Sequence, residues 1–147
     1  MSFWEKLFSG RMKTRASSPL PAIPAGTGLA EIMSEDLTIL FKHSSSCPVS
    51  WAAHAQVSRF FQENPEAPVR IVSVTRERPL SQQIAAATGI RHESPQILVL
   101  RRGEVVASAS HGEITRDRLN LVYRNARDPV AGSANSVADS AERVTQQ

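Results

Sequence analysis

The chain has 147 residues, of which 41% are apolar and 21% are charged, and this balance fits one globular domain with short extensions. It contains no run of 18 apolar residues that could span a membrane, and its first residues lack the apolar core of a secretory leader. The single cysteine, Cys47, excludes an internal disulfide and a zinc site made of several thiolates. We therefore expect a cytoplasmic protein.

The net charge of +3 is distributed unevenly along the chain. Residues 1–28 carry four basic and one acidic side chain, residues 29–126 carry eleven and ten, and residues 127–147 carry two and three. The corresponding net charges are +3, +1 and −1. A nucleic-acid-binding domain usually shows a basic stripe, so the nearly neutral central segment argues against a nucleic-acid partner.

Residues 1–28 are predicted to be a flexible leader that ends in a Pro/Ser linker. Their first part has apolar side chains at helical spacing, namely Phe3, Trp4, Leu7 and Phe8. A helix over residues 1–15 that docks on a membrane surface is one interpretation, but we favour a leader that packs locally or not at all. The prolines and serines of residues 16–24 indicate a linker. Residues 127–147 are rich in Ser, Ala, Asp and Gln, which predicts a flexible tail.

The first half of residues 29–126 predicts two helices and two strands. Residues 29–35 fit a short helix, and the apolar run 37–41 fits a strand buried on both faces. Pro48 suits the first position of the next helix, which Asn64-Pro65 ends. The apolar stripe expected on this helix comprises Val49, Ala53, Val57, Phe60 and Phe61. A second strand follows at residues 69–74.

The second half predicts a helix, a hairpin and a last helix. Gly89 is placed to end the helix around residues 80–87 in a left-handed conformation. Strands at 96–100 and 104–107 are close enough for a hairpin, and Thr115 suits the N-cap of the last helix. The order β-α-β-α-β-β-α predicts an α/β protein with a thioredoxin-like three-layer fold and a central mixed sheet, within residues 29–126.

Cys47 falls where the first strand gives way to a helix, at the expected N-cap. Unpaired backbone N–H groups and the helix dipole favour a thiolate there. The dipole supplies typically ~0.3–1 and at best ~2 kcal/mol, which lowers the pKa by about one unit at ~1.4 kcal/mol per unit. The three serines before it and Pro48 after it indicate an exposed turn. We therefore predict a reactive thiol rather than a buried structural cysteine.

Ser50 occupies the position that a second cysteine holds in a C-x-x-C redox motif. Since the chain contains no other thiol, a mixed disulfide on Cys47 needs an external thiol for its release. Ser94-Pro95 comes directly before a predicted strand. Thioredoxin-like proteins keep a cis-proline at this place beside the cysteine, where the backbone of the preceding residue pairs with the substrate.

Three segments carry a resemblance to a known family. They are Phe-Lys-His-Ser-Ser-Ser-Cys-Pro-Val-Ser at 41–50, Ile-Arg-His-Glu-Ser-Pro-Gln at 90–96 and Ser-His-Gly-Glu-Ile-Thr at 110–115. Together they resemble the monothiol bacilliredoxins of the bacillithiol system, over residues 29–125. The resemblance implies removal of bacillithiol from S-bacillithiolated proteins, with Cys47 taking bacillithiol as a mixed disulfide. Bacillithiol would then be a co-substrate, and we expect a monomer with no bound cofactor and no metal.

The remaining candidate residues surround this motif. Ser46, Pro48 and Ser50 belong to the cysteine segment, and His43 either stabilises the thiolate when protonated or is a structural histidine. The substrate-binding candidates are Ser94, Pro95, His92 and Lys42. His111 lies in a loop that could approach the rim of the same site. For Lys42, Arg91 and Arg101 the two interpretations are solvated surface, which is the default for each, and contact with the malate carboxylates of bacillithiol. Trp51 is either a partner-facing aromatic or a covered surface residue.

Two other functions remain open at this point. One is an iron–sulfur carrier of the monothiol-glutaredoxin type, in which two chains each give one cysteine to a cluster. That type has Gly after the cysteine, where this chain has Pro48. The other is a thioredoxin-like binding module without redox turnover, in which Cys47 would be alkylated slowly at neutral pH.

Overall fold

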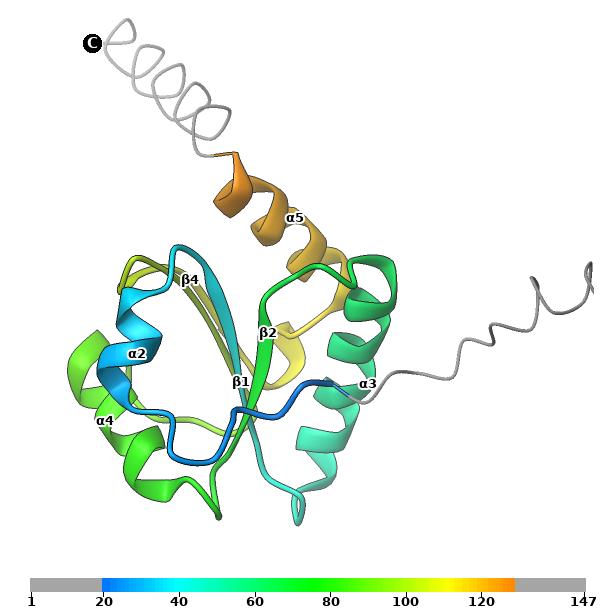
Figure 1. The fold of residues 1–147 in the computed structure, drawn as a ribbon. Coiled ribbons are helices and arrows are strands. Elements are labelled where there is room, and N and C mark those ends of the chain that lie inside the picture. The colour runs from blue at the N-terminus through cyan, green and yellow to red at the C-terminus, as the bar shows by residue number, and fades with distance from the viewer. Residues whose placement is uncertain (1–19, 129–147) are drawn as a thin grey trace, which may run out of the picture.

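A four-stranded mixed sheet lies between two layers of helices in the computed structural model, which describes residues 20–128 (Figure 1). The strands stand in the order β2-β1-β3-β4, with β2 parallel to β1 and the other neighbours antiparallel. Their bounds are Thr38–His43 for β1, Val69–Ser73 for β2, Gln96–Arg101 for β3 and Glu104–Ser110 for β4. This confirms the thioredoxin-like α/β fold predicted from the sequence.

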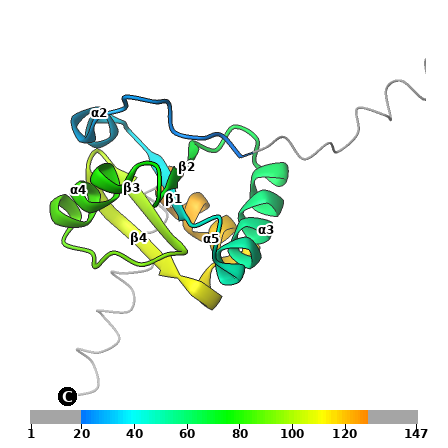
Figure 2. The same cartoon turned by 90° about the horizontal axis from the view of Figure 1, so that it is seen from below.

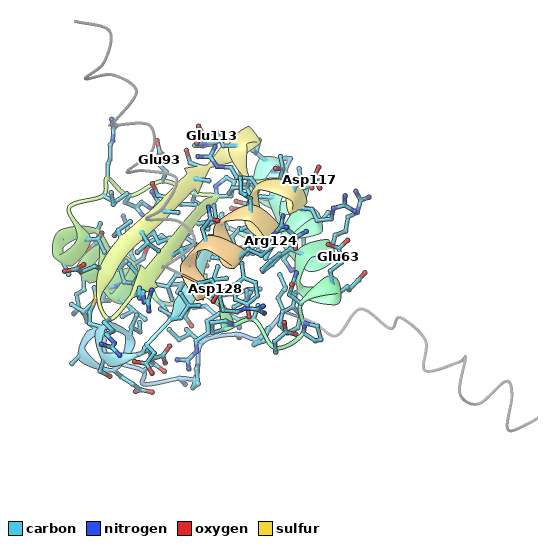
Figure 3. The ribbon with its side chains drawn as sticks, turned by 90° about the horizontal axis from the view of Figure 1, so that it is seen from above. Glu63, Glu93, Glu113, Asp117, Arg124 and Asp128 are labelled. Carbon is cyan, nitrogen blue, oxygen red and sulfur yellow. The ribbon has the colours of Figure 1, made fainter. Side chains whose placement is uncertain are left out.

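Two pairs of helices cover the two faces of the sheet (Figure 2). Their bounds are Leu29–Ser34 for α2, Pro48–Glu63 for α3, Arg78–Thr88 for α4 and Arg116–Arg127 for α5, and a short 3₁₀ helix spans His111–Glu113. One core fills the space between the sheet and α3 with α5, and a second core fills the space between the sheet and α2 with α4. Glu63 of α3 and Asp117 of α5 lie on the same side of the molecule (Figure 3), where Arg116 pairs with both carboxylates.

β1 runs through the middle of the sheet, and all six of its residues are buried. Because side chains alternate along a strand, Ile39 and Phe41 enter the core beneath α3, whereas Leu40 enters the core beneath α4. The same alternation sends His43 toward α3 and Lys42 toward α4. The last two residues of β1 therefore point to opposite sides of the sheet at the end where Cys47 lies.

The local signals in the sequence act as predicted. Gly89 ends α4 with a φ of 69°, and the Thr115 hydroxyl accepts a hydrogen bond from the N–H of Arg118 at the start of α5. The predicted stripe on α3 is wrong at its first residue, because Val49 is 47% exposed and Ser50 is buried instead. Ser50 has polar partners in the interior, so the buried face of α3 begins with a hydroxyl.

The linker predicted up to residue 28 is also wrong in its last part. Leu20 and Ile23 are buried, one in each core. The Ile23 N–H donates to the Ile71 carbonyl at 2.9 Å, and the Ile71 N–H donates to the Pro21 carbonyl at 2.8 Å. This short segment therefore packs along β2. The rest of the predicted leader, residues 1–19, and residues 129–147 of the predicted tail lie outside the described residues.

Within residues 20–128, every helix is too short or too polar to cross a lipid bilayer.

Candidate active site

Cys47 is the N-cap of α3, as predicted, with Pro48 at the first helical position. β1 ends at His43, and the three serines that follow turn the chain toward α3. The Cys47 N–H donates to the Ser44 carbonyl at 3.3 Å, and the Cys47 carbonyl accepts from the N–H of Trp51 at 3.3 Å. The side chain is partly exposed, so another molecule can approach the sulfur.

The first turn of α3 lowers the pKa of the Cys47 thiol. The backbone N–H of Ser50 makes the largest contribution, and the N–H of Val49 and the Ser50 hydroxyl act in the same direction. Partial burial opposes them by favouring the neutral thiol. The direction is the one that the N-cap position predicts, and the backbone N–H groups at the helix start are its main cause.

Ser50 connects the cysteine turn to the loop before β3. Its hydroxyl is buried, accepts from the Ser44 N–H at 3.3 Å and lies 3.4 Å from the Ser94 hydroxyl. The Ser94–Pro95 peptide bond is cis. The structure therefore brings Cys47, Ser50, Ser94 and Pro95 together from segments that are more than 40 residues apart. Figure 2 views this end of the sheet, where β1 ends and α3 begins.

Of the two interpretations of His43, the geometry favours the structural histidine. It is 8% exposed, and its ring packs edge-on against Trp51 at 4.8 Å and lies 5.2 Å from His54. Burial and the neighbouring His54 lower the pKa of His43, and the Ser50 backbone offsets only part of this. The imidazole packs beneath the first turns of α3, where burial favours its neutral form.

Apolar side chains beside Cys47 face the solvent. Val49 is 47% exposed and Trp51 is 51% exposed, and Pro48 between Cys47 and Val49 is exposed as well. The Trp51 indole N–H donates to the Ser45 carbonyl at 2.9 Å, which holds the ring over the serine turn. Of the two interpretations of Trp51, this geometry favours the partner-facing aromatic. Ser46, the other predicted motif residue, is exposed, and its hydroxyl lies 3.1 Å from that of Ser44.

Lys42 is fully buried, so it cannot touch a ligand as a surface residue would. Its ammonium donates to the Ser81 carbonyl at 2.9 Å and lies 3.2 Å from His92 Nδ1. Burial lowers the pKa of Lys42 to about 8. Its predicted direct contact with the malate carboxylates is therefore wrong. His92 itself is exposed on the loop before Pro95.

The other predicted ligand residues are divided between the two ends of the sheet. Arg101 ends β3, which runs antiparallel to β1 and begins beside Lys42. Its guanidinium therefore lies at the end away from Cys47, near the Ala126 carbonyl, and this corrects its predicted role. Arg91 is exposed on the loop before Pro95, and the His111 N–H donates to the Pro95 carbonyl at 3.1 Å. His111 and Arg91 therefore border the proline loop.

Sequence reasoning missed three residues near this end of the molecule. His54 packs with His43 and Trp51, and Arg78 and Ser81 on α4 lie close to Lys42 and His92. Helical spacing places His54 one turn after Ser50, but no local signal brings α4 to the end of β1. No group of three or more His, Cys, Asp or Glu side chains within residues 20–128 is arranged to hold a metal ion.

The fold and the single activated cysteine define a thioredoxin-like protein of the monothiol type. The family model of monothiol bacilliredoxin BrxC matches residues 25–119, and the chain belongs to this family. Among solved structures, a thioredoxin-fold protein proposed to be an oxidoreductase is 32% identical, with a TM-score of 0.59 over 63% of this chain and 83% of that one.

Two more distant solved structures share the fold alone. Desulfothioredoxin from Desulfovibrio vulgaris Hildenborough, in its reduced form, is 18% identical, with a TM-score of 0.57 over 72% of this chain and 96% of that one. Mitochondrial thioredoxin 3 from Saccharomyces cerevisiae, in its oxidised form, is 10% identical, with a TM-score of 0.55 over 74% and 97%. The family and the fold together support a thioredoxin-like redox protein that uses one thiol.

Proposed function

We propose that this protein removes bacillithiol from S-bacillithiolated proteins in the cytoplasm, acting as a monomer through a mixed disulfide on Cys47. The observation that carries the proposal is the partly exposed Cys47 at the start of α3, with buried Ser50 where a resolving thiol would stand. Membership of the monothiol bacilliredoxin family supports bacillithiol as the co-substrate.

The reaction is a thiol–disulfide exchange that needs no other oxidant or reductant in its first step. The Cys47 thiolate attacks the bacillithiol sulfur of the modified protein. A disulfide forms between Cys47 and bacillithiol, the bond to the substrate protein breaks, and the substrate cysteine leaves as a thiolate that takes up a proton from water. A second low-molecular-weight thiol, as its thiolate, then attacks the bacillithiol sulfur of the mixed disulfide. A disulfide forms between the two small thiols, the bond to Cys47 breaks, and Cys47 leaves as the thiolate.

Three features of the site serve this step. The N–H groups of Ser50 and Val49 stabilise the attacking thiolate. The Ser94 backbone beside Pro95 is available to align the amide of bacillithiol, and its side chain is joined to the cysteine helix through Ser50. The exposed Trp51 and Val49 offer apolar surface to the substrate protein.

The test is a stopped reaction between a bacillithiolated protein and the full chain, followed by intact-protein mass. We expect the bacillithiol adduct on Cys47 to accumulate one-for-one with substrate consumed, and to persist until a second thiol is added. Cys47→Ser should abolish transfer, whereas Ser45→Ala, an exposed change in the same turn, should preserve it. Transfer that survives in Cys47→Ser would refute the mechanism. Equal reaction with a glutathionylated substrate would remove the bacillithiol assignment.

A further inference from the structure

A pocket with basic side chains opens beside the proline loop, on the face of the sheet opposite to α3. It has a volume of about 370 Å³ and is lined by Val74, Thr75, Arg78, Ser81, Gln82 and His92. Beneath it lies the ammonium of Lys42, which contacts two of the lining residues. We call this site the basic pocket. The loop from α4 to β3 crosses this end of the sheet (Figure 2).

The hydrogen bonds of His92 fix which of its nitrogens carries the proton. As an ammonium, Lys42 has only N–H groups to offer, so it donates to His92 Nδ1, and the Ser81 hydroxyl lies 3.2 Å from the same atom. Nδ1 is therefore the acceptor of the neutral ring, and the proton is on Nε2. Among the hydrogen bonds of residues 20–128, none uses Nε2 of His92. The pocket thus has an N–H donor available to a bound acceptor.

The positive charges of the pocket lack carboxylate partners. Within residues 20–128, neither Lys42 nor Arg78 forms an ion pair. Lys42 and Arg78 both lower the pKa of His92, after the larger effect of burial. Two carboxylates lie nearby, but neither pairs with Lys42 or Arg78. Glu93 raises the pKa of His92, and Glu77 accepts a hydrogen bond from the Ser73 N–H at 2.6 Å. A buried cation without a counter-ion is costly, and an anion in the pocket would offset that cost.

The basic pocket is connected to the cysteine by a short piece of chain. Ser94 touches Ser50 on the first turn of α3, and His92 in the pocket is two residues before Ser94. Two extended residues span at most about 7 Å. A ligand whose sulfur reaches Cys47 and whose body follows the proline loop would therefore bring its far end to His92 and Arg78.

We propose that the basic pocket binds the carboxylates of the low-molecular-weight thiol whose sulfur reaches Cys47. This rests on the proposed function, because bacillithiol carries its carboxylates on the malate group. Arg78 and the Nε2–H of His92 would contact the carboxylates, and Lys42 would act from below by its charge and by holding His92 in the required tautomer. Lys42 is thus a positioning residue.

The first test needs no thiol chemistry. L-Malate is titrated into the full-length protein while the His92 Cε1–H resonance is followed by NMR over a range of pH. We expect saturable binding that raises the pKa of His92, because a nearby anion stabilises the protonated ring. Arg78→Gln should weaken malate binding roughly fivefold, the upper end for an exposed ion pair. Arg76→Gln is the matched control, since Arg76 is exposed two residues away and does not line the pocket.

The second test compares transfer of two adducts to Cys47, from one peptide carrying bacillithiol and from the same peptide carrying 2-mercaptoethanol, which has no carboxylate. We expect the ratio of the two rates to fall roughly fivefold in Arg78→Gln and to stay at the wild-type value in Arg76→Gln. Lys42→Met should lower the same ratio, and circular dichroism checks that this variant is folded. If Lys42→Met does not fold, the comparison of Arg78→Gln with Arg76→Gln decides the test.

Several outcomes would overturn the pocket while leaving the proposed function intact. They are a His92 resonance that does not respond to malate, saturable binding of inorganic phosphate without any binding of malate, and a rate ratio unchanged in Arg78→Gln. Failure of Cys47 to accept bacillithiol from any substrate would instead overturn the proposed function, and the malate titration would still decide whether the pocket binds carboxylates.

Discussion

Ser50→Ala removes the hydroxyl that joins the cysteine turn to the proline loop. Ser50 is fully buried, and its oxygen has two partners, the Ser44 N–H at 3.3 Å and the Ser94 hydroxyl at 3.4 Å. Alanine fits the same helix position, so the change deletes hydrogen bonds without adding volume. The backbone N–H of residue 50, which contributes most to lowering the pKa of Cys47, is retained.

The magnitude follows from these contacts. A neutral hydrogen bond contributes about 1 kcal/mol to stability, and the two distances here, 3.3 and 3.4 Å, lie just beyond the usual range. We therefore expect Ser50→Ala to lower the free energy of unfolding by about 1–2 kcal/mol, which corresponds to a fall in Tm of about 4–8 °C for a domain of this size. The pKa of Cys47 should rise slightly but stay below that of an ordinary thiol, about 8.5.

Thermal unfolding under reducing conditions measures the first effect, and thiolate absorbance against pH measures the second. Ser45→Ala is the control, because this serine lies in the same turn with its side chain exposed. The reasoning is refuted if the Tm of Ser50→Ala equals that of Ser45→Ala. It is also refuted if the Cys47 titration moves to that of an ordinary thiol, since the backbone would then not stabilise the thiolate.

Three further predictions concern charge and packing. The pKa of Cys47 is lowered in the folded state. The reduced protein should therefore gain stability over Cys47→Ser as pH rises from this lowered pKa toward that of the unfolded thiol, and lose the gain as pH falls. Urea unfolding of both proteins at several pH values measures the difference, and parallel pH profiles would contradict it. Lys42→Met should raise the pKa of His92, because Lys42 lowers it; NMR titration measures this, and an unchanged pKa would count against the contact. Ile23→Ala should destabilise the protein by about 2–4 kcal/mol, because Ile23 is 4% exposed, whereas Val106→Ala, at a site 48% exposed, should have little effect on the same unfolding curve.

Local signals allowed much of the fold and the centre of the site to be predicted. Pro48 fixes the start of α3, which makes Cys47 its N-cap, and Gly89 and Thr115 mark the end of α4 and the start of α5. Each of these depends on the conformation of a few consecutive residues. The contact between Ser50 and Ser94 is long-range, and the fold predicted only that Pro95 would lie beside Cys47.

The features that were predicted wrongly depend on partners far along the chain. Lys42 follows an apolar run and was expected at the surface, but β1 continues for two residues, and Ser81 and His92, 39 and 50 residues away, surround its ammonium. Ile23 lies among prolines, which favour a linker, yet its backbone pairs with Ile71. In both cases the segment that provides the partner cannot be identified from the neighbouring sequence.

The pairing of residues 20–24 with β2 also affects how copies of this chain can associate. An uncovered edge strand offers unpaired N–H and C=O groups to another molecule, and here the bridge between Ala22 and Ile71 occupies the middle of the β2 edge. Within residues 20–128, β4 is the edge that stays open. For residues 20–128 taken alone, strand addition at β4 would join two copies of the sheet, and the segment paired with Ile71 would stand in the way of a further copy at β2.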